Sequence, residues 1–199
     1  MQHIIHLSKD KKLQKIIAVQ PIQQIVTRPH VYLRLCASII SQQLSTKVAD
    51  VIYARFLLLY TNKKPTLQQI IDTPFDALRS IGLSNAKANY VKNVCVFFIQ
   101  EKITDKKLQA MNNETLIQYL TQIKGVGQWT VEMILMFTLG REDVFAADDL
   151  VIQQSMAKLY DIDMGNKKEC KQKMLQIASK WSPYKTYACK YLWGYKDAT

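Results

Sequence analysis

The chain has 199 residues, a length typical of one domain or of two small lobes. Hydrophobic residues make up 48% of it, which allows a substantial core and excludes the disordered, collagen-like and disulfide-scaffold classes. Lys and Arg outnumber Asp and Glu by 27 to 16, so the formal net charge is +11. Such an excess attracts a polyanion such as nucleic acid, although a basic surface that only maintains solubility is the alternative.

Neither a membrane span nor secretion is expected. The sequence contains no run of about 18 apolar residues, and no uninterrupted apolar signal region follows the N-terminus. The four cysteines, Cys36, Cys95, Cys170 and Cys189, lack the close spacing of zinc or iron–sulfur ligands. We therefore expect free thiols in a reducing compartment, which is the cytoplasm with its nucleoid, or the nucleus in a eukaryote.

Apolar residues spaced by three and four positions predict amphipathic helices, and alternating strand patterns are almost absent. The first long apolar series covers residues 36–59. Polar residues 41–45 interrupt it, and Ser45 is the candidate N-cap of its second part. Farther along the chain, Thr66 and Gln69 match a capping box.

The later helices are predicted from their terminal residues. Thr73 is the candidate cap of a helix with Pro74 in its first turn, and Gly82 predicts the end of this helix. Asn113 is expected to cap a helix that continues to about Gln122. The remaining helices are expected after residue 127 as far as about Gly140, and then at about 150–160, 167–180 and 184–193.

The strongest local signal is the segment from Ile123 to Thr130, which reads Ile-Lys-Gly-Val-Gly-Gln-Trp-Thr. Two glycines one residue apart allow a tight turn whose backbone can approach another group closely. The free N–H groups at the start of the following helix form an anion site suited to phosphate, and Lys124 adds a positive charge beside it. An ordinary helix–helix turn, with glycine as a C-cap, is the alternative.

The second signal is an aspartate pair, Asp148 and Asp149, at the start of the helix predicted at 150–160. An aspartate in this position is commonly an N-cap, stabilised by the free N–H groups and the helix dipole. A fixed anion can also stabilise positive charge on a sugar ring that loses its leaving group. No histidine follows His30, so acid–base chemistry in this region must depend on carboxylates.

The glycine turn, Trp129 and Asp149 together resemble the helix-hairpin-helix superfamily of DNA base-excision glycosylases. Within the superfamily the resemblance is greatest to DNA-3-methyladenine glycosylase II. The similarity covers roughly residues 30–195 in the same order. Three further stretches support it, namely Leu35–Ser45, Ile81–Ala88 and Trp181–Trp193.

The resemblance implies a two-lobed, all-α fold of about ten helices that contains a helix-hairpin-helix motif. Its inner lobe is expected at about 31–144, and its outer lobe at about 1–30 together with 145–199. The catalytic aspartate of the family corresponds to Asp149, which is expected at the cleft between the lobes. The implied partner is double-stranded DNA. The protein is expected to act as a monomer, and no membrane partner is expected.

The same resemblance implies a hydrolase that releases alkylated bases such as 3-methyladenine in base excision repair. Trp129 stands where lyase-competent members carry a nucleophilic lysine. An indole cannot form a Schiff base, so water is the expected acceptor and the enzyme is expected to be monofunctional.

Two groups of residues are expected to contact the substrate. The base pocket is expected to use aromatic and flexible apolar side chains, because stacking favours a cationic base; core packing is the alternative for each ring. These candidates are Trp129, Met133, Trp181 and Tyr184. The DNA-binding candidates are Gln42, Gln43, Leu44, Lys124, Gly125, Val126, Gly127 and Thr130, of which residues 42–44 include the candidate wedge that fills the space of a flipped nucleotide.

The chain departs from the family pattern at two positions. Ala147 replaces the proline that usually precedes the aspartate pair, and Met133 replaces an aromatic residue of some relatives. No cofactor is expected to be required. By analogy, the carbonyl groups of Thr121, Ile123 and Val126 are the candidate ligands of a structural monovalent cation in the hairpin.

Two alternative functions remain compatible with these motifs. One is a non-catalytic helix-hairpin-helix protein that binds damaged DNA and keeps Asp149 only as a helix cap. The other is a bifunctional glycosylase–lyase for oxidised bases, which would recruit a lysine such as Lys124.

Overall fold

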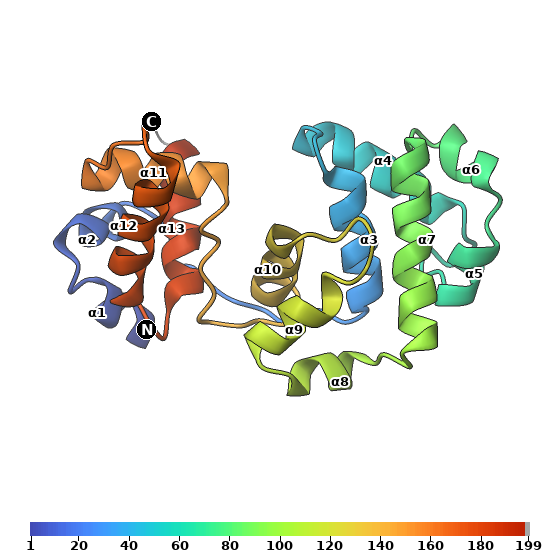
Figure 1. Cartoon of the computed structure of the whole chain (residues 1–199), viewed down its shortest axis with the longest axis horizontal. Coiled ribbons are helices and arrows are strands. Elements are labelled where there is room, and N and C mark those ends of the chain that lie inside the picture. The colour runs from blue at the N-terminus through green and yellow to red at the C-terminus, as the bar shows by residue number, and fades with distance from the viewer. Residues whose placement is uncertain (198–199) are drawn as a thin grey trace. The chain divides into compact units, whose positions relative to one another are not determined.

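The computed structural model describes residues 1–197, in which every regular element is an α-helix (Figure 1). The predicted all-α class is confirmed, although the described residues form thirteen helices rather than about ten. None of these helices is long and apolar enough to cross a membrane. In chain order they are α1 (Gln2–Leu7), α2 (Lys11–Ala18), α3 (Val31–Ser41), α4 (Thr46–Leu58), α5 (Leu67–Asp72), α6 (Phe75–Ser80), α7 (Asn85–Gln100), α8 (Asp105–Ala110), α9 (Asn113–Leu120), α10 (Gln128–Phe137), α11 (Leu150–Tyr160), α12 (Lys167–Ser179) and α13 (Lys185–Asp197).

The chain divides into two compact units, each with its own core. Unit 1 combines Met1–Thr27 with the described residues from Leu135 onward, and unit 2 is the continuous segment Arg28–Ile134. The second boundary therefore comes before the one predicted at about residue 144. The physical reason is that residues 141–144 bond to α13 of unit 1: the Thr186 N–H donates to the Glu142 carbonyl at 2.9 Å.

Unit 2 is organised around the long helix α7, which packs against α3, α5 and α6. Apolar side chains of α3 and α7, including Leu35, Cys36, Val91 and Val94, are fully buried. Lys87 of α7 donates from Nζ to carbonyls 40 and 42 at 2.8 and 2.7 Å, where its charge complements the negative end of the α3 dipole. Burial lowers the pKa of this lysine.

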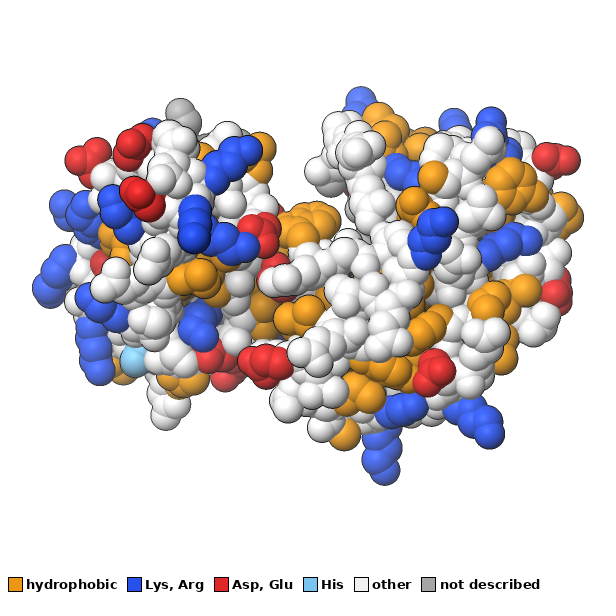
Figure 2. Space-filling view, in the orientation of Figure 1, with side chains coloured by type: hydrophobic (Ala, Val, Ile, Leu, Met, Phe, Trp, Pro, Cys, Tyr) orange, Lys and Arg blue, Asp and Glu red, His pale blue; other side chains and the backbone are white. Residues whose placement is uncertain are grey.

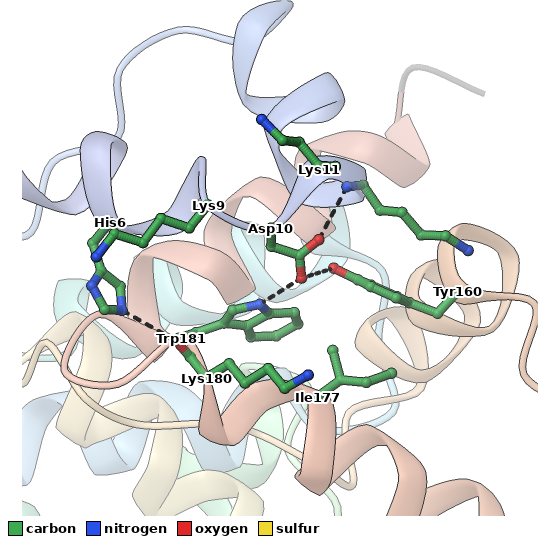
Figure 3. A pocket seen from close by; sticks show the side chains of 9 residues that line it. His6, Lys9, Asp10, Lys11, Tyr160, Ile177, Lys180 and Trp181 are labelled. Carbon is green, nitrogen blue, oxygen red and sulfur yellow. Dashed lines mark hydrogen bonds between the residues drawn. The ribbon is translucent and has the colours of Figure 1, made fainter.

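Unit 1 brings the two ends of the chain together, as α2 packs against both α11 and α13. Asp10, the N-cap of α2, accepts hydrogen bonds from Tyr160 Oη at 2.7 Å and Trp181 Nε1 at 3.1 Å (Figure 3). It also accepts the N–H groups of residues 12 and 13. This carboxylate therefore joins the N-terminal segment to α11 and to the loop after α12.

Asp10 is one of the residues that line a surface cavity of about 520 Å³ (Figure 3). Its lining is mainly basic and aromatic, and the residues are His6, Lys9, Asp10, Lys11, Lys12, Tyr160, Ile177, Lys180 and Trp181. Apart from Trp181, no predicted site residue lies in this cavity.

Several predicted helix ends are confirmed and others are displaced. The capping box of Thr66 and Gln69 is present, with both of its hydrogen bonds. Ser45 directly precedes α4, but its side chain makes no capping bond. The prediction that Thr73 caps the next helix is wrong, because Pro74 occupies that position and the Thr73 hydroxyl donates back to the Gln69 carbonyl at 2.7 Å.

The prediction for Asn113 is wrong by one residue. Asn112 caps α9 instead, because its side-chain oxygen reaches the Thr115 N–H at 2.8 Å. Gly82 follows α6 with a φ of +107°, as expected for a glycine that ends a helix. The predicted last three helices correspond to α11, α12 and α13.

The carboxylate of Asp10 predicts how unit 1 responds to acid. Burial raises the pKa of Asp10, but hydrogen bonds from Tyr160, Trp181 and the backbone outweigh this effect, so the pKa is lowered. Its stabilisation is therefore complete above the pKa of the unfolded chain, about 4, and is lost as the pH falls toward the folded value. We expect the difference in melting temperature between wild type and Asp10→Asn to be constant from about pH 5 to 7 and to shrink toward pH 3. Thermal unfolding followed by circular dichroism measures this difference, and a difference unchanged at pH 3 would contradict the assignment.

Candidate nucleic-acid interface and catalytic carboxylate

The predicted glycine turn lies in unit 2 and joins α9 to α10, whose residues from Leu135 onward are assigned to unit 1. The Val126 N–H donates to the Ile123 carbonyl at 2.9 Å and closes the turn. Gly125 has a φ of +102°, and a Cβ added to it would lie 2.2 Å from Cγ of the Tyr90 ring on α7. Glycine at position 125 is therefore required by the fold itself.

Gly127 has a different environment. It is exposed, and a Cβ added to it would meet no atom within 4 Å. It directly precedes α10, whose first N–H groups have no partner within the helix. The packing of the chain therefore does not require glycine at position 127. A glycine in such a place is expected where another molecule approaches the backbone closely.

The polar loop after α3 meets the hairpin, so two predicted DNA-binding segments lie together in unit 2. Gln42 donates from Nε2 to the Gly125 carbonyl at 3.2 Å, and Asn93 donates from Nδ2 to the Lys124 carbonyl at 3.3 Å. Gln43 is exposed with a φ of +58°, and Leu44 keeps 37% of its surface exposed. These two side chains remain the accessible candidates for a wedge.

Two of the predicted DNA contacts need correction. The side chains of Val126 and Thr130 are buried, with 5% and 2% of their surfaces exposed. They support the hairpin from inside unit 2, so their side chains are not available to a phosphate. Figure 2 shows the Lys and Arg side chains spread over the visible faces, so the positive charge is diffuse there.

The predicted catalytic carboxylate lies in unit 1 as the N-cap of α11. Oδ1 of Asp149 accepts the Ile152 N–H at 2.9 Å and the Trp193 Nε1–H at 3.0 Å. The residue is 8% exposed. Both donors stabilise a buried negative charge, so Asp149 combines the capping role with a fixed, desolvated anion.

Asp148 has the opposite character. Its carboxylate is about half exposed and pairs with Lys171 Nζ at 2.6 Å. An exposed ion pair of this kind contributes little to stability and is screened by salt. The two neighbouring carboxylates are therefore distinguished by structure, and Asp149 is the one held in place by donors from two helices.

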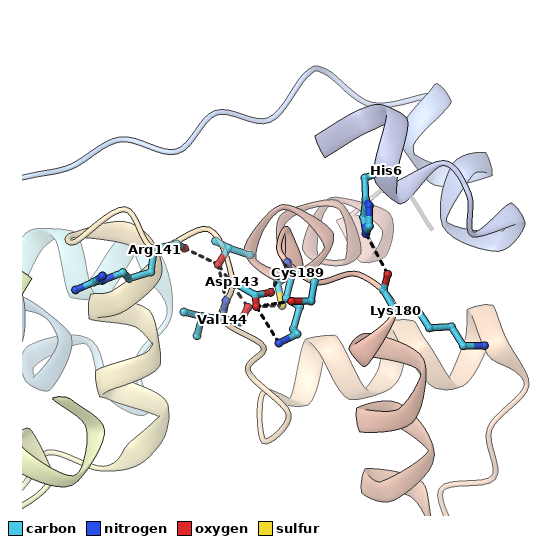
Figure 4. Close-up of polar contacts among 9 residues, drawn as sticks. His6, Arg141, Asp143, Val144, Lys180 and Cys189 are labelled. Atoms are coloured by element: carbon cyan, nitrogen blue, oxygen red, sulfur yellow. Dashed lines mark hydrogen bonds and ion pairs between the residues drawn. The ribbon is translucent and has the colours of Figure 1, made fainter. Parts of the chain in front are cut away.

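The loop that leads to Asp149 is fixed to the start of α13 (Figure 4). The Thr186 hydroxyl donates to the Arg141 carbonyl at 2.7 Å, and it accepts the Val144 N–H at 3.1 Å. Asp143 accepts the hydroxyl of Ser182 at 2.7 Å. These bonds hold both sides of the loop against one helix.

The loop is also held at Ala147, where the family pattern has proline. Gln153 of α11 donates from Nε2 to the Ala147 carbonyl at 2.8 Å. The side chain of Ala147 is buried, with 6% of its surface exposed. Packing and this hydrogen bond therefore restrain the position next to Asp148.

The base-pocket candidates Trp129 and Met133 lie four residues apart, on one face of α10. Trp129 is 39% exposed and Met133 is partly buried. Phe137, near the end of α10, belongs to unit 1 and is 39% exposed. Its ring centroid lies 5.5 Å from that of Trp193, so Phe137 and Trp193 are two site candidates that the sequence interpretation missed.

The assignment of Trp181 to the base pocket is wrong. Only 1% of this residue is exposed, and its indole N–H donates to Asp10 at the helix α2 N-terminus. Tyr184 is partly buried beside α1, where its ring lies 5.6 Å from His6 and its hydroxyl donates to Gln2 Oε1 at 3.3 Å. The tryptophan that reaches the catalytic candidate is Trp193.

Comparisons with known proteins agree with this arrangement. The HhH-GPD superfamily of base excision DNA repair proteins matches residues 36–180. DNA-3-methyladenine glycosylase 1 of Schizosaccharomyces pombe is 35% identical over 195 residues, which cover 95% of this chain and 84% of that protein.

Solved structures are similar over nearly the whole chain. The 3-methyladenine DNA glycosylase Mag1 of S. pombe, in complex with abasic DNA, has a TM-score of 0.84 and 34% identity, covering 97% of this chain and 95% of that chain. DNA-3-methyladenine glycosidase of Bacillus halodurans has a TM-score of 0.85 and 33% identity, covering 98% and 88%. The hairpin, the capped aspartate and these similarities together show that the chain belongs to the HhH-GPD superfamily of base excision DNA repair proteins.

Proposed function

We propose that the chain is a monofunctional DNA glycosylase that hydrolyses the N-glycosidic bond of alkylated bases, such as 3-methyladenine, in duplex DNA. The observation that carries this proposal is Asp149, a nearly buried carboxylate held by Ile152 and Trp193. The relatives named as 3-methyladenine glycosylases supply the substrate class. Within that class we assign the chain to the DNA-3-methyladenine glycosylase II type, on the pattern of Trp129 and Asp149.

In the proposed reaction, the N–H groups at the start of α10 bind the DNA backbone. The damaged nucleotide leaves the base stack, because its glycosidic bond is inaccessible inside the duplex. The C1′–N bond breaks with its electron pair moving to the base, and Asp149 stabilises the positive charge that develops on the sugar. Water then forms the C1′–O bond and releases a proton.

An alkylated base explains why a strong general acid is not needed. Such a base carries a positive charge before the reaction and leaves as a neutral molecule when it takes the bonding pair. Stacking on an electron-rich ring also favours a cationic base, and Trp129 and Met133 are the proposed contacts for it. Trp129 has no nucleophilic amine, so water remains the acceptor.

The hairpin also suits a structural monovalent cation. The candidate ligands are the carbonyl groups of Thr121, Ile123 and Val126, which follow the C-terminus of α9. Neutral oxygen ligands at the negative end of a helix dipole match the chemistry of such an ion. Bound there, the cation would stabilise the turn and take no part in bond cleavage.

We further propose that the chain acts as a monomer on double-stranded DNA, in the cytoplasm with its nucleoid or in a nucleus. The net charge of +11 supports a polyanionic partner. An excision assay on duplexes that carry alkylated or oxidised bases tests the substrate class, because the proposal expects release from the alkylated duplexes alone.

The aspartate pair provides the first test of the mechanism. Asp149→Asn keeps the shape and capping ability of the side chain but removes its charge. We expect single-turnover release of 3-methyladenine to fall by about 100-fold or more, while the affinity for duplex DNA is unchanged. Asp148→Asn, the matched control, is expected to stay within about twofold of wild type because its ion pair is exposed. Near-normal excision by Asp149→Asn would assign the residue to capping alone.

The two glycines of the hairpin predict separate effects. Gly127→Ala is expected to keep the melting temperature but to weaken duplex binding by roughly tenfold, because the added methyl group lies at the surface that approaches phosphate. Gly125→Ala is expected to lower the free energy of unfolding by about 2–4 kcal/mol, because of the positive φ and the clash with Tyr90. Thermal unfolding and fluorescence anisotropy measure the two effects. Unchanged DNA affinity in Gly127→Ala would remove the hairpin from the interface.

Borohydride trapping tests the monofunctional mechanism. A lyase forms a Schiff base that borohydride reduces to a stable protein–DNA adduct, whereas hydrolysis leaves an intact abasic strand. We expect free base, no adduct, and strand breaks only after alkali. An adduct that disappears in Lys124→Ala would identify Lys124 as the nucleophile and replace the hydrolytic mechanism with a lyase mechanism.

A further inference from the structure

The hydrogen bond between Trp193 and Asp149 joins α13 to the N-terminus of α11. We propose that Trp193 is a positioning residue, whose indole N–H holds the Asp149 carboxylate in the orientation in which it acts on the sugar. This inference rests on the glycosylase function proposed above. It assigns to Trp193 a role in the reaction that operates through Asp149, separate from any contact of its ring with a base.

The two donors to Asp149 have complementary effects. The Ile152 N–H and the Trp193 Nε1–H both reach Oδ1, at 2.9 and 3.0 Å. A single capping bond tolerates a range of directions, so the carboxylate can still turn to some extent about the soft Cβ–Cγ torsion and carry Oδ1 with it. A second donor, from a different helix, restricts that rotation and fixes the direction of the whole group.

The indole ring is itself held in place. Its centroid lies 5.5 Å from that of Phe137, with an angle of 38° between the ring planes. Next to it in the chain, the Leu192 carbonyl accepts the Ser155 hydroxyl at 2.9 Å, which ties α13 to α11. The donor and the acceptor therefore belong to two helices that are bonded directly beside the contact.

Indole is well suited to this task. Its N–H only donates and has no proton-accepting lone pair, so it cannot take the proton of the attacking water. A hydrogen bond to an ionised carboxylate is also stronger than one between neutral groups. Trp193 can therefore only donate to Asp149, and it takes no proton from the attacking water.

The molecule contains a matched indole–carboxylate pair. Trp181 donates from Nε1 to Oδ2 of Asp10 at 3.1 Å, also within unit 1. That pair joins α2 to the loop after α12 and includes no proposed site residue. The effect of losing an indole–carboxylate bond on folding can therefore be measured separately from its effect on the reaction.

The kinetic experiment compares Trp193→Phe with Trp181→Phe, because each change keeps an aromatic ring and removes one N–H donor. For Trp193→Phe we expect the single-turnover excision rate at saturating enzyme to fall about tenfold or more, with unchanged affinity for duplex DNA containing an abasic-site analogue. The excision rate should fall by the same factor for 3-methyladenine and for 7-methylguanine, because Asp149 acts on the deoxyribose that carries either base. Trp181→Phe is expected to lower the melting temperature and leave the rate unchanged.

A spectroscopic arm tests the hydrogen bond without depending on activity. The three tryptophans give three indole N–H resonances in a ¹H–¹⁵N correlation spectrum, and the Trp→Phe variants assign them. Asp149→Asn is expected to move the Trp193 proton upfield and leave that of Trp181 in place, whereas Asp10→Asn has the reverse effect. An unchanged chemical shift of the Trp193 indole proton in Asp149→Asn would overturn the proposed contact.

The outcomes separate this inference from the function on which it rests. If the wild-type protein releases no alkylated base, the proposed function fails and the inference fails with it. If the wild type is active and Trp193→Phe is equally active, the inference alone is wrong. A rate that falls for one base and not for the other would assign Trp193 to base recognition and also contradict the positioning role.

Discussion

A nearly buried carboxylate is stable only when donors replace the water that it loses, and Asp149 meets this requirement through two helices. The backbone of α11 supplies one donor, and Trp193 of α13 supplies the other. Helix α13 also holds the loop that precedes Asp149, because Thr186 bonds to both Arg141 and Val144. Helix α13 therefore bonds both to the carboxylate and to the chain that leads to it.

The hairpin in unit 2 depends in a similar way on α7. Tyr90 of this helix packs where a side chain at position 125 would lie, and Asn93 bonds to the Lys124 carbonyl. Lys87 of the same helix holds the carbonyl of Gln42, whose side chain reaches Gly125. The backbone of the turn is thus supported by contacts with the long helix α7. In each unit one helix therefore bonds to more than one part of the candidate site.

Local sequence patterns predicted the helical class, the capping box at Thr66, the hairpin and the position of Asp149 at a helix start. These features depend on residues close together in the chain, where spacing and the chemistry of glycine or aspartate determine the backbone. The role of Trp193 was different, because the sequence indicated Trp181 as a pocket candidate and assigned no role to Trp193. Which of them reaches Asp149 depends on how α13 packs against α11, and this long-range packing leaves no local pattern.

Long-range packing also explains the boundary between the units and the burial of Thr130, neither of which the sequence predicted. Residues 141–144 belong with α13 because of hydrogen bonds across more than 40 positions, and no spacing rule predicts such a pairing. Thr130 lies in the signature of the hairpin, yet it faces the interior of unit 2. A motif identifies the segment that matters, but the surrounding helices decide which of its side chains remain accessible.

The interrupted course of unit 1 has a consequence for the order in which the protein forms during synthesis. Unit 2 is one continuous segment, so all of its contacts are available once Ile134 has left the ribosome. Unit 1 must wait, because Asp10 bonds to Trp181 and Asp149 to Trp193. A nascent chain can therefore form the glycine turn before the hydrogen bonds that hold Asp149 are available. On the proposed function, the segment that binds the DNA backbone would fold before the carboxylate that acts on the sugar.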